Sequence, residues 1–215
     1  MRNHIRRILI ADDHDIIRRG VRTLLETRQD VIVVAEAATG RQALTLARET
    51  RPDIAVVDYS LPELNGRDLT VELKREFPRL EVLVYTMHDR EEMIMQVLQA
   101  GARGVVLKSD AEKHLFAAVD ALSINRPYFS PSMSETLLQE YLRVRPSDAF
   151  KVLTHREREV VQLIAEGKIN KQAAELLNIS VKTVETHRAT VMQKLKLRTT
   201  AELVRYAIRN HILEA

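Results

Sequence analysis

The first 125 residues alternate between short apolar runs and longer stretches of helical spacing. These runs are four or five residues long, apolar apart from Arg7, and rich in β-branched side chains; they lie at 7–11, 31–35, 54–57, 82–85 and 104–107. Such runs predict strands that are buried on both faces of a sheet. Helical spacing follows at 15–26, 43–47, 69–77, 93–98 and 111–122. The alternation predicts βαβ units and an α/β fold with a doubly wound parallel sheet.

The last 65 residues show only helical spacing. Thr154 and Glu157 form a capping-box pattern at the start of one helix, and Gly167 ends it. Further helices are predicted over 170–177, 181–194 and 200–210, with Ser180 as the N-cap of the 181–194 helix. Four short helices, two of them joined by a three-residue turn, predict an all-α helix-turn-helix domain.

Proline-containing breaker clusters lie between these two patterns, around 125–127, 130–132 and 145–148. Helical spacing over 133–144 predicts one short helix inside this segment. We therefore expect an α/β domain over 1–124, a linker over 125–150 and the helical domain over 151–215.

Charge divides along the same line. Residues 1–125 hold 18 Lys+Arg against 20 Asp+Glu, and the remainder hold 15 against 10, so a chain of net charge +3 has a basic second half. A basic helical half favours a nucleic-acid partner. Cysteine is absent, which excludes disulfides and thiolate metal ligands. No membrane span or signal peptide is visible, so we expect a cytoplasmic location and no membrane partner.

Four of the five predicted strands end in polar side chains, which a parallel sheet gathers at one edge. These residues are Asp12, Asp13, Asp58, Thr86 and Lys108. Clustered carboxylates need a cation, and an all-oxygen site suits Mg²⁺. The pattern indicates phosphoryl transfer, with Asp58 as the nucleophile, Lys108 pairing with a phosphate oxygen and Thr86 sensing the phosphate. His14 follows the acid pair and is interpreted as a loop residue.

Residues 5–122 resemble a response-regulator receiver domain. The resemblance is carried by the acid set, Thr86, Lys108, the spacing of Pro62 and Gly66, and the turn at 101–104. It implies a flavodoxin-like five-stranded sheet of order 2-1-3-4-5. It also implies Asp58 as the phosphoacceptor, with Mg²⁺ (or Mn²⁺) held by Asp13, Asp58 and the Tyr59 carbonyl, and by Asp12 through water.

Two positions depart from many receivers. Val105 stands where an aromatic switch residue is common, and Tyr85 beside Thr86 is the candidate for part of that role. Ser109 stands where proline often follows the lysine.

Residues 152–212 resemble a LuxR-type helix-turn-helix domain. The residues that carry this resemblance are Leu153, Thr154, Arg156, Glu157, Glu159, Val160, Gly167, Asn170, Ala173, Ala174, Leu176, Ser180 to Val184, His187, Lys194 and Leu195. The predicted 181–194 helix has an inward stripe with Val184 and Val191, and an outward polar stripe suited to base edges. The resemblance places Glu185, Thr186 and Ala189 at bases, and Lys182, Thr183, Arg188 and Lys194 at phosphates. It assigns dimerisation to Leu203, Val204, Tyr206 and Ala207.

The combined order is that of the NarL/FixJ class of bacterial response regulators. It implies a homodimeric transcription regulator that is not an enzyme on an external substrate. Its implied partners are a sensor histidine kinase and double-stranded DNA, with RNA polymerase as a further candidate. Two alternatives stay open. A metal-dependent aspartyl-phosphate phosphatase commonly has an acid where this chain has Ser60, and DNA binding independent of phosphate is left open by Val105. A nicotinamide or flavin oxidoreductase is disfavoured because no glycine fingerprint follows the first strand.

Overall fold

The structure is a computed structural model, and it describes residues 5–87, 89–110, 112–131, 133 and 153–213. The chain divides into two compact units, Met1–Val144 and Arg145–Ala215. The predicted linker helix over 133–144 lies almost wholly outside the described residues. Within the described part of the chain, no helix is long and apolar enough to cross a membrane.

The first unit is a parallel sheet of strands β1 (Arg6–Ala11), β2 (Val31–Ala37), β3 (Ile54–Val57), β4 (Glu81–Thr86), β5 (Gly104–Leu107) and β6 (Tyr128–Phe129). Their order is β2-β1-β3-β4-β5-β6. The predicted order 2-1-3-4-5 is confirmed, but the predicted count of five strands is one short. The sixth strand lies in the segment predicted as linker, where Ser130 N donates to Val105 O at 3.2 Å. Two residues that follow a proline carry no periodic signal, so the pattern could not reveal them.

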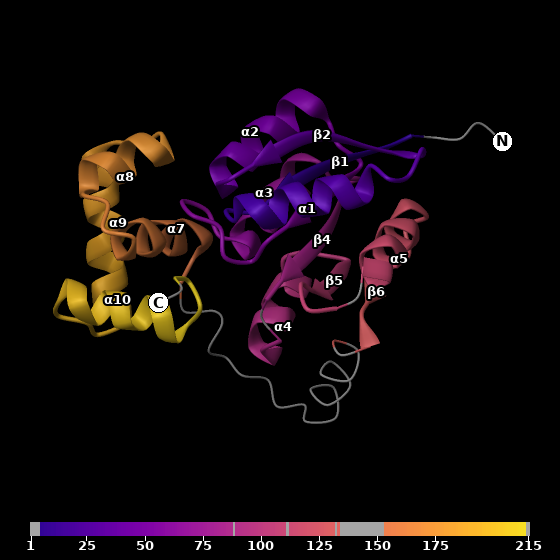
Figure 1. Cartoon of the computed structure of the whole chain (residues 1–215). Helices are drawn as coiled ribbons and strands as arrows, with labels where there is room; N and C mark the ends of the chain where they lie inside the picture. Colours follow the sequence, from indigo (N-terminus) through magenta and orange to yellow (C-terminus); the bar gives the residue numbers. More distant parts are fainter. Residues whose placement is uncertain (1–4, 88, 111, 132, 134–152, 214–215) are drawn as a thin grey trace. The chain divides into compact units, whose positions relative to one another are not determined.

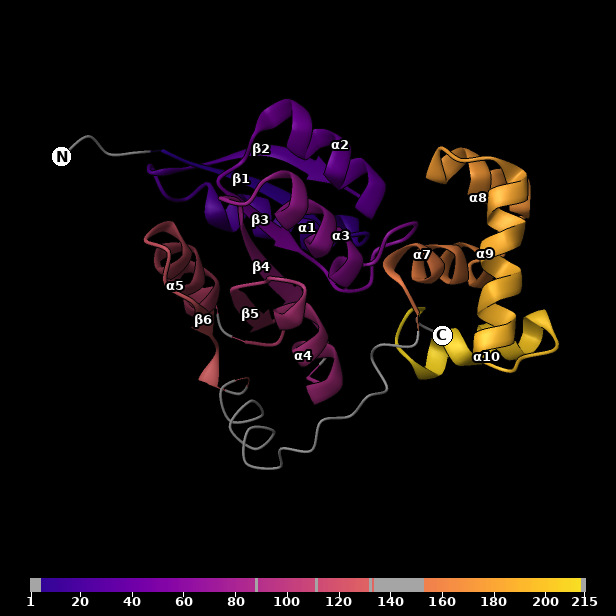
Figure 2. The same cartoon turned by 180° about the vertical axis from the view of Figure 1, so that it is seen from behind.

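Helices cover both faces of this sheet because strand side chains alternate between the faces. Leu9 and Ala11 face the core that includes helices α2 (Gly40–Thr50), α3 (Gly66–Glu76) and α4 (Glu91–Gln99). Ile8 and Ile10 face the core that includes α1 (Asp15–Leu25) and α5 (Glu112–Ser123). Figure 1 shows these helices around the sheet, and Figure 2 shows them from behind.

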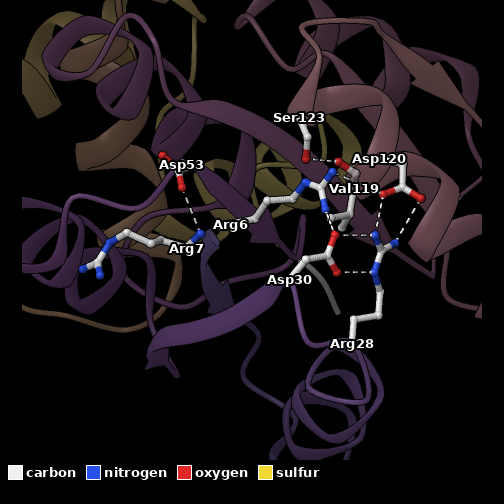
Figure 3. A network of polar contacts seen from close by, with 8 residues as sticks. All are labelled: Arg6, Arg7, Arg28, Asp30, Asp53, Val119, Asp120 and Ser123. Carbon is white, nitrogen blue, oxygen red and sulfur yellow. Dashed lines mark hydrogen bonds and ion pairs between the residues drawn. The ribbon is translucent and has the colours of Figure 1, made fainter. Parts of the chain in front are cut away.

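A network of charged residues joins the turn after α1 to the last turns of α5 (Figure 3). The Arg28 guanidinium donates two hydrogen bonds to Asp120, at 2.8 and 3.0 Å, and two to Asp30, at 2.9 and 3.0 Å. Arg6 also contacts Asp30. The hydrogen bonds from Arg28 lower the pKa of Asp30 to about 2, and the network fixes the carboxyl end of α5.

The second unit consists of α7 (His155–Ala165), α8 (Asn170–Leu177), α9 (Val181–Lys194) and α10 (Thr200–Arg209) around one core. The predicted capping box of α7 is confirmed, as is Ser180, whose hydroxyl accepts from Thr183 N at 3.0 Å. Gly167 has a φ of 85°, which glycine adopts without strain and which ends the run of α7. The predicted helix-turn-helix fold is confirmed.

Candidate functional site

The carboxylates at the ends of β1 and β3 lie side by side. Ala11 pairs with Val57 in parallel register, so Asp12 and Asp58 leave adjacent strands at the same level. Both side chains are buried. One ligand atom from each of Asp12, Asp13, His14 and Asp58 lies within 4.8 Å of the others. The structure therefore brings together the three acids that the sequence predicted, and adds His14.

Gly66 allows the loop after Asp58 to fold back against the site. A Cβ on Gly66 would lie 2.2 Å from the Asp58 carbonyl oxygen and 2.8 Å from the Tyr59 Cα. Gly66 N also donates to the Tyr59 carbonyl oxygen at 2.8 Å. This approach needs a residue without a side chain, and it fixes the carbonyl that was predicted as a metal ligand.

Lys108 bridges the two buried acids. Its Nζ lies 2.7 Å from Asp58 Oδ2 and 2.7 Å from Asp12 Oδ2, and its side chain is 3% exposed. Burial alone would lower the pKa of Lys108, but the attraction of Asp58 and the hydrogen bonds that Lys108 donates to both acids raise it. Burial raises the pKa of Asp58, against the opposing effect of Lys108. The ammonium is therefore held in its charged form beside the candidate nucleophile.

Thr86 ends β4 and is buried beneath this edge. Together with Tyr59, Met93 and Val105 it lines a cavity of about 10 Å³, too small for more than one water. The Tyr59 hydroxyl donates to Gln96 Oε1 on α4 at 3.2 Å. Movement of Thr86 would thus open space beside Tyr59, whose hydroxyl is hydrogen-bonded to α4.

Tyr85 does not take the position of the missing aromatic residue. It packs against the core on the α1 and α5 face, whereas Val105 lies in the core on the α2, α3 and α4 face. The expectation that Tyr85 substitutes for an aromatic at 105 is therefore wrong. Neighbouring residues of a strand point to opposite faces, which explains the result.

The residues present fit a divalent cation. Three carboxylates with a fixed backbone carbonyl supply the oxygen ligands that Mg²⁺ prefers. One of these acids, Asp13, keeps 33% of its side-chain surface exposed, which leaves a route for an ion and its waters. His14 was interpreted as a loop residue, and it does lie in the loop before α1, where its ring contacts the acid pair.

The outward face of α9 is exposed, as its pattern predicted. The residues on it are Lys182, Glu185, Thr186, Ala189 and Gln193. Val184 and Val191 are buried on the opposite face, and His187 is half-buried. A polar, exposed helix face on a compact helical unit is the arrangement that enters a major groove.

Two residues predicted to contact phosphates, Arg188 and Lys194, already have polar partners within the domain. Arg188 donates to Asn170 Oδ1 at 3.2 Å and to Thr200 Oγ1 at 2.7 Å. Lys194 Nζ lies 2.8 Å from Oε2 of the buried Glu157. Burial would raise the pKa of Glu157, but the hydrogen bond from Lys194 and those at Thr154 lower it. Lys194 therefore stabilises the start of α7, whereas Lys182 is exposed and Thr183 half-buried at the start of α9.

The residues predicted for dimerisation do not share one face of α10. Leu203 and Ala207 are buried in the core of the helical unit. Val204 and Tyr206 are half-buried. Only the latter two retain surface that another subunit could cover.

Comparison with known proteins agrees with this architecture. Residues 8–120 match the response regulator receiver domain, and residues 151–207 match the bacterial regulatory proteins of the luxR family. The chain is 38% identical to the oxygen regulatory protein NreC of Staphylococcus epidermidis over 97% of its own length and 99% of that protein. It is 37% identical to NreC of Staphylococcus carnosus over the same shares.

Two solved structures extend the comparison. A LuxR-family two-component response regulator from Aurantimonas sp. SI85-9A1 is 36% identical, with a TM-score of 0.62 over 64% of this chain and 98% of that chain. RcsB of Salmonella enterica serovar Typhimurium, bound to promoter rprA with a phosphomimetic, is 30% identical, with a TM-score of 0.60 over 94% and 97%. The chain belongs to the two-component response regulators that join a receiver domain to a LuxR-type DNA-binding domain.

Proposed function

We propose that phosphorylation of Asp58 by a sensor histidine kinase controls dimerisation of this regulator and its binding to specific DNA. The observation that carries the proposal is the Lys108 ammonium, buried and bound to both Asp12 and Asp58 at 2.7 Å. A buried lysine held charged between two acids, at the edge where parallel strands end, is suited to receiving a third anionic group.

In this mechanism a carboxylate oxygen of Asp58 attacks the phosphorus of a phosphohistidine on the kinase. The new O–P bond forms as the P–N bond breaks, and the histidine nitrogen leaves with the electron pair. A divalent ion, Mg²⁺ or Mn²⁺, held by Asp13, Asp58 and the Tyr59 carbonyl, with Asp12 through water, would offset the charge on the phosphoryl oxygens. Lys108 then pairs with one phosphoryl oxygen.

The signal leaves the site through Thr86 and Tyr59. The Thr86 hydroxyl moves to donate a hydrogen bond to the phosphoryl group, and the space that it leaves is shared with Tyr59. Because the Tyr59 hydroxyl is hydrogen-bonded to Gln96, repacking of Tyr59 changes the position of α4 against the sheet. This is a two-state element biased by a local change of charge.

DNA is read by α9 in the major groove. Glu185, Thr186 and Ala189 face the base edges, and a carboxylate there can accept from cytosine N4. Lys182 and Thr183 contact phosphates at the start of the helix. Arg188 can reach a phosphate only by sharing, or giving up, its hydrogen bonds to Asn170 and Thr200. Val204 and Tyr206 contribute to the dimer contact. The RcsB–DNA complex supports this assignment because its protein chain matches 94% of this chain at 30% identity, with a TM-score of 0.61.

The domains that perform these steps are a receiver over 1–124, a linker over 125–150 and a DNA-binding domain over 151–215. The sensor kinase and double-stranded DNA are the partners, with RNA polymerase as a further candidate, all in the bacterial cytoplasm.

The test uses the full-length protein with Mg²⁺, with and without a small-molecule phosphodonor. Duplexes selected from random DNA serve as ligand, and dimer content is followed by sedimentation. We expect the phosphodonor to add one phosphoryl group, raise the dimer fraction and tighten DNA binding in the wild type only. Asp58→Ala should lose all three responses, and Glu49→Gln, an exposed acid on α2, should keep them. Equal DNA binding by wild type and Asp58→Ala, unchanged by the phosphodonor, would overturn the proposal.

A further inference from the structure

His14 lies against the acidic site, directly before α1. Its backbone N donates to Asp12 Oδ1 at 2.8 Å, which fixes the start of α1 beside the carboxylates. Its ring Nδ1 lies 2.8 Å from Asp13 Oδ1 and 3.4 Å from Asp12 Oδ1. Among the residues that the structure describes, the ring makes polar contacts with these two acids alone. The imidazole nitrogen is therefore aimed at the oxygens that are expected to surround the cation.

These separations match the edges of a metal coordination shell. Ligand atoms about 2.1 Å from one ion lie roughly 3 Å apart when adjacent and about 4.2 Å apart when opposite. The 2.8 Å between His14 Nδ1 and Asp13 Oδ1 is close to the shorter value. The set of four ligand atoms spans no more than 4.8 Å, so a small side-chain adjustment would place Asp13, His14 and Asp58 around one ion, with Asp12 near enough to act through water.

A nitrogen ligand changes which ions the site prefers. Mg²⁺ takes oxygen ligands almost entirely, whereas imidazole is a favoured ligand of the later first-row divalent ions. An imidazole between two carboxylates therefore adds nothing for Mg²⁺ and one strong bond for an ion such as Co²⁺, Ni²⁺ or Zn²⁺.

We propose that His14 is a further protein ligand at the acidic site, and that it makes this receiver bind late first-row divalent ions more tightly than its carboxylates alone would. The proposal rests on the proposed function because the ion occupies the same site beside Asp58. The availability of such ions would then set how readily Asp58 accepts a phosphoryl group. His14 leaves 63% of its side-chain surface exposed, so it can turn toward an arriving ion without unpacking the core.

The test measures metal binding directly, on the full-length protein at one fixed pH for all variants. Co²⁺ is titrated while its visible absorption is recorded, and Mg²⁺ is titrated by calorimetry. The variants are His14→Gln, which keeps a polar side chain of similar reach, and Asp13→Asn, which removes an acid from the same site. The chain has seven histidines, so the Co²⁺ signal that Asp13→Asn abolishes defines binding at this site.

We expect His14→Gln to weaken Co²⁺ binding at this site by about tenfold or more, and to leave Mg²⁺ affinity within about twofold. The Co²⁺ absorption band should also shift as a nitrogen ligand is lost. If His14→Gln leaves Co²⁺ affinity and spectrum unchanged, or weakens Co²⁺ and Mg²⁺ equally, His14 is not a selective ligand. If the wild type binds Mg²⁺ no better than Asp13→Asn does, the acidic site of the proposed function fails as well. Melting curves of each variant show that the fold is kept.

Discussion

The hydroxyl of Tyr59 donates a hydrogen bond to the side-chain carbonyl of Gln96, at 3.2 Å, and both side chains are buried. Tyr59 follows Asp58 directly, and Gln96 lies in α4, so one hydrogen bond joins the phosphoacceptor loop to a helix 37 residues away. Val105 leaves the usual aromatic position aliphatic, and this bond is a polar connection that links the site to α4.

Removal of that hydrogen bond should separate phosphorylation from response. We expect Tyr59→Phe to accept a phosphoryl group at Asp58 while showing a several-fold smaller rise in dimer content. A double-mutant cycle with Gln96→Leu should give a coupling of about 0.5–1.5 kcal/mol in the free energy of unfolding. Tyr128→Phe is the matched control, since it also removes a tyrosine hydroxyl contact, here a half-buried one to His114 on α5. Additive effects of Tyr59→Phe and Gln96→Leu would exclude the connection.

Loss of the bridging ammonium should destabilise the receiver and make its stability depend on metal. Lys108→Met leaves Asp12 and Asp58 buried without their common partner, and breaking a buried ion pair costs about 3–5 kcal/mol. We expect a lower melting temperature that Mg²⁺ raises more in the variant than in the wild type. Lys113→Met, an exposed lysine of α5, should change neither quantity. A variant that melts like the wild type without Mg²⁺ would contradict the role of Lys108.

Acid should weaken the contribution of the Arg28 network. The pKa of Asp30 is about 2 in the folded protein because Arg28 binds it, against 3.8 for the free side chain. A lowered folded pKa gives stability that is fully present above the unfolded pKa and is lost as the pH falls toward the folded one. The difference in unfolding free energy between wild type and Arg28→Gln should therefore be constant near neutral pH and shrink between about pH 4 and 2. Arg19→Gln, whose partner Asp15 is exposed, should give a smaller difference.

Two lysines of the DNA-binding domain should behave differently. Lys182→Ala removes an exposed cation from the start of α9, so DNA binding should weaken and the slope of log K against log salt should fall by about 1, with stability unchanged. Lys194→Met removes the partner of buried Glu157, so the melting temperature of the domain should fall. Salt-dependent fluorescence anisotropy and calorimetry separate the two effects. The opposite pattern would place Lys194 on the DNA and deny that role to Lys182.

The sequence revealed those parts of the site that depend on local pattern. Strands β1, β3 and β5 end where their apolar runs end, and parallel pairing then brings Asp12, Asp58, Thr86 and Lys108 to one edge. The bond between Tyr59 and Gln96 and the ion pair between Glu157 and Lys194 each join residues 37 apart. Such pairs depend on how helices pack, which periodicity does not specify. Strand alternation alone places Tyr85 on the opposite face of β4 from Val84 and Thr86, so the sequence was sufficient to show that Tyr85 cannot replace an aromatic residue at position 105.

The ion pair between Arg28 and Asp120 restrains the carboxyl end of α5, so its first turn is the end that is freer to move. Lys108, which would bind the phosphoryl group, lies four residues before the other end of the helix. A helix of 12 residues is about 18 Å long, so a rotation of about 5° around the pinned turn displaces the first turn by about 1.5 Å. Such a rotation of α5 would turn about its restrained end, beside β2. The displacement caused by phosphorylation would be largest at the first turn of α5. A partner that binds only the phosphorylated state would therefore contact that end.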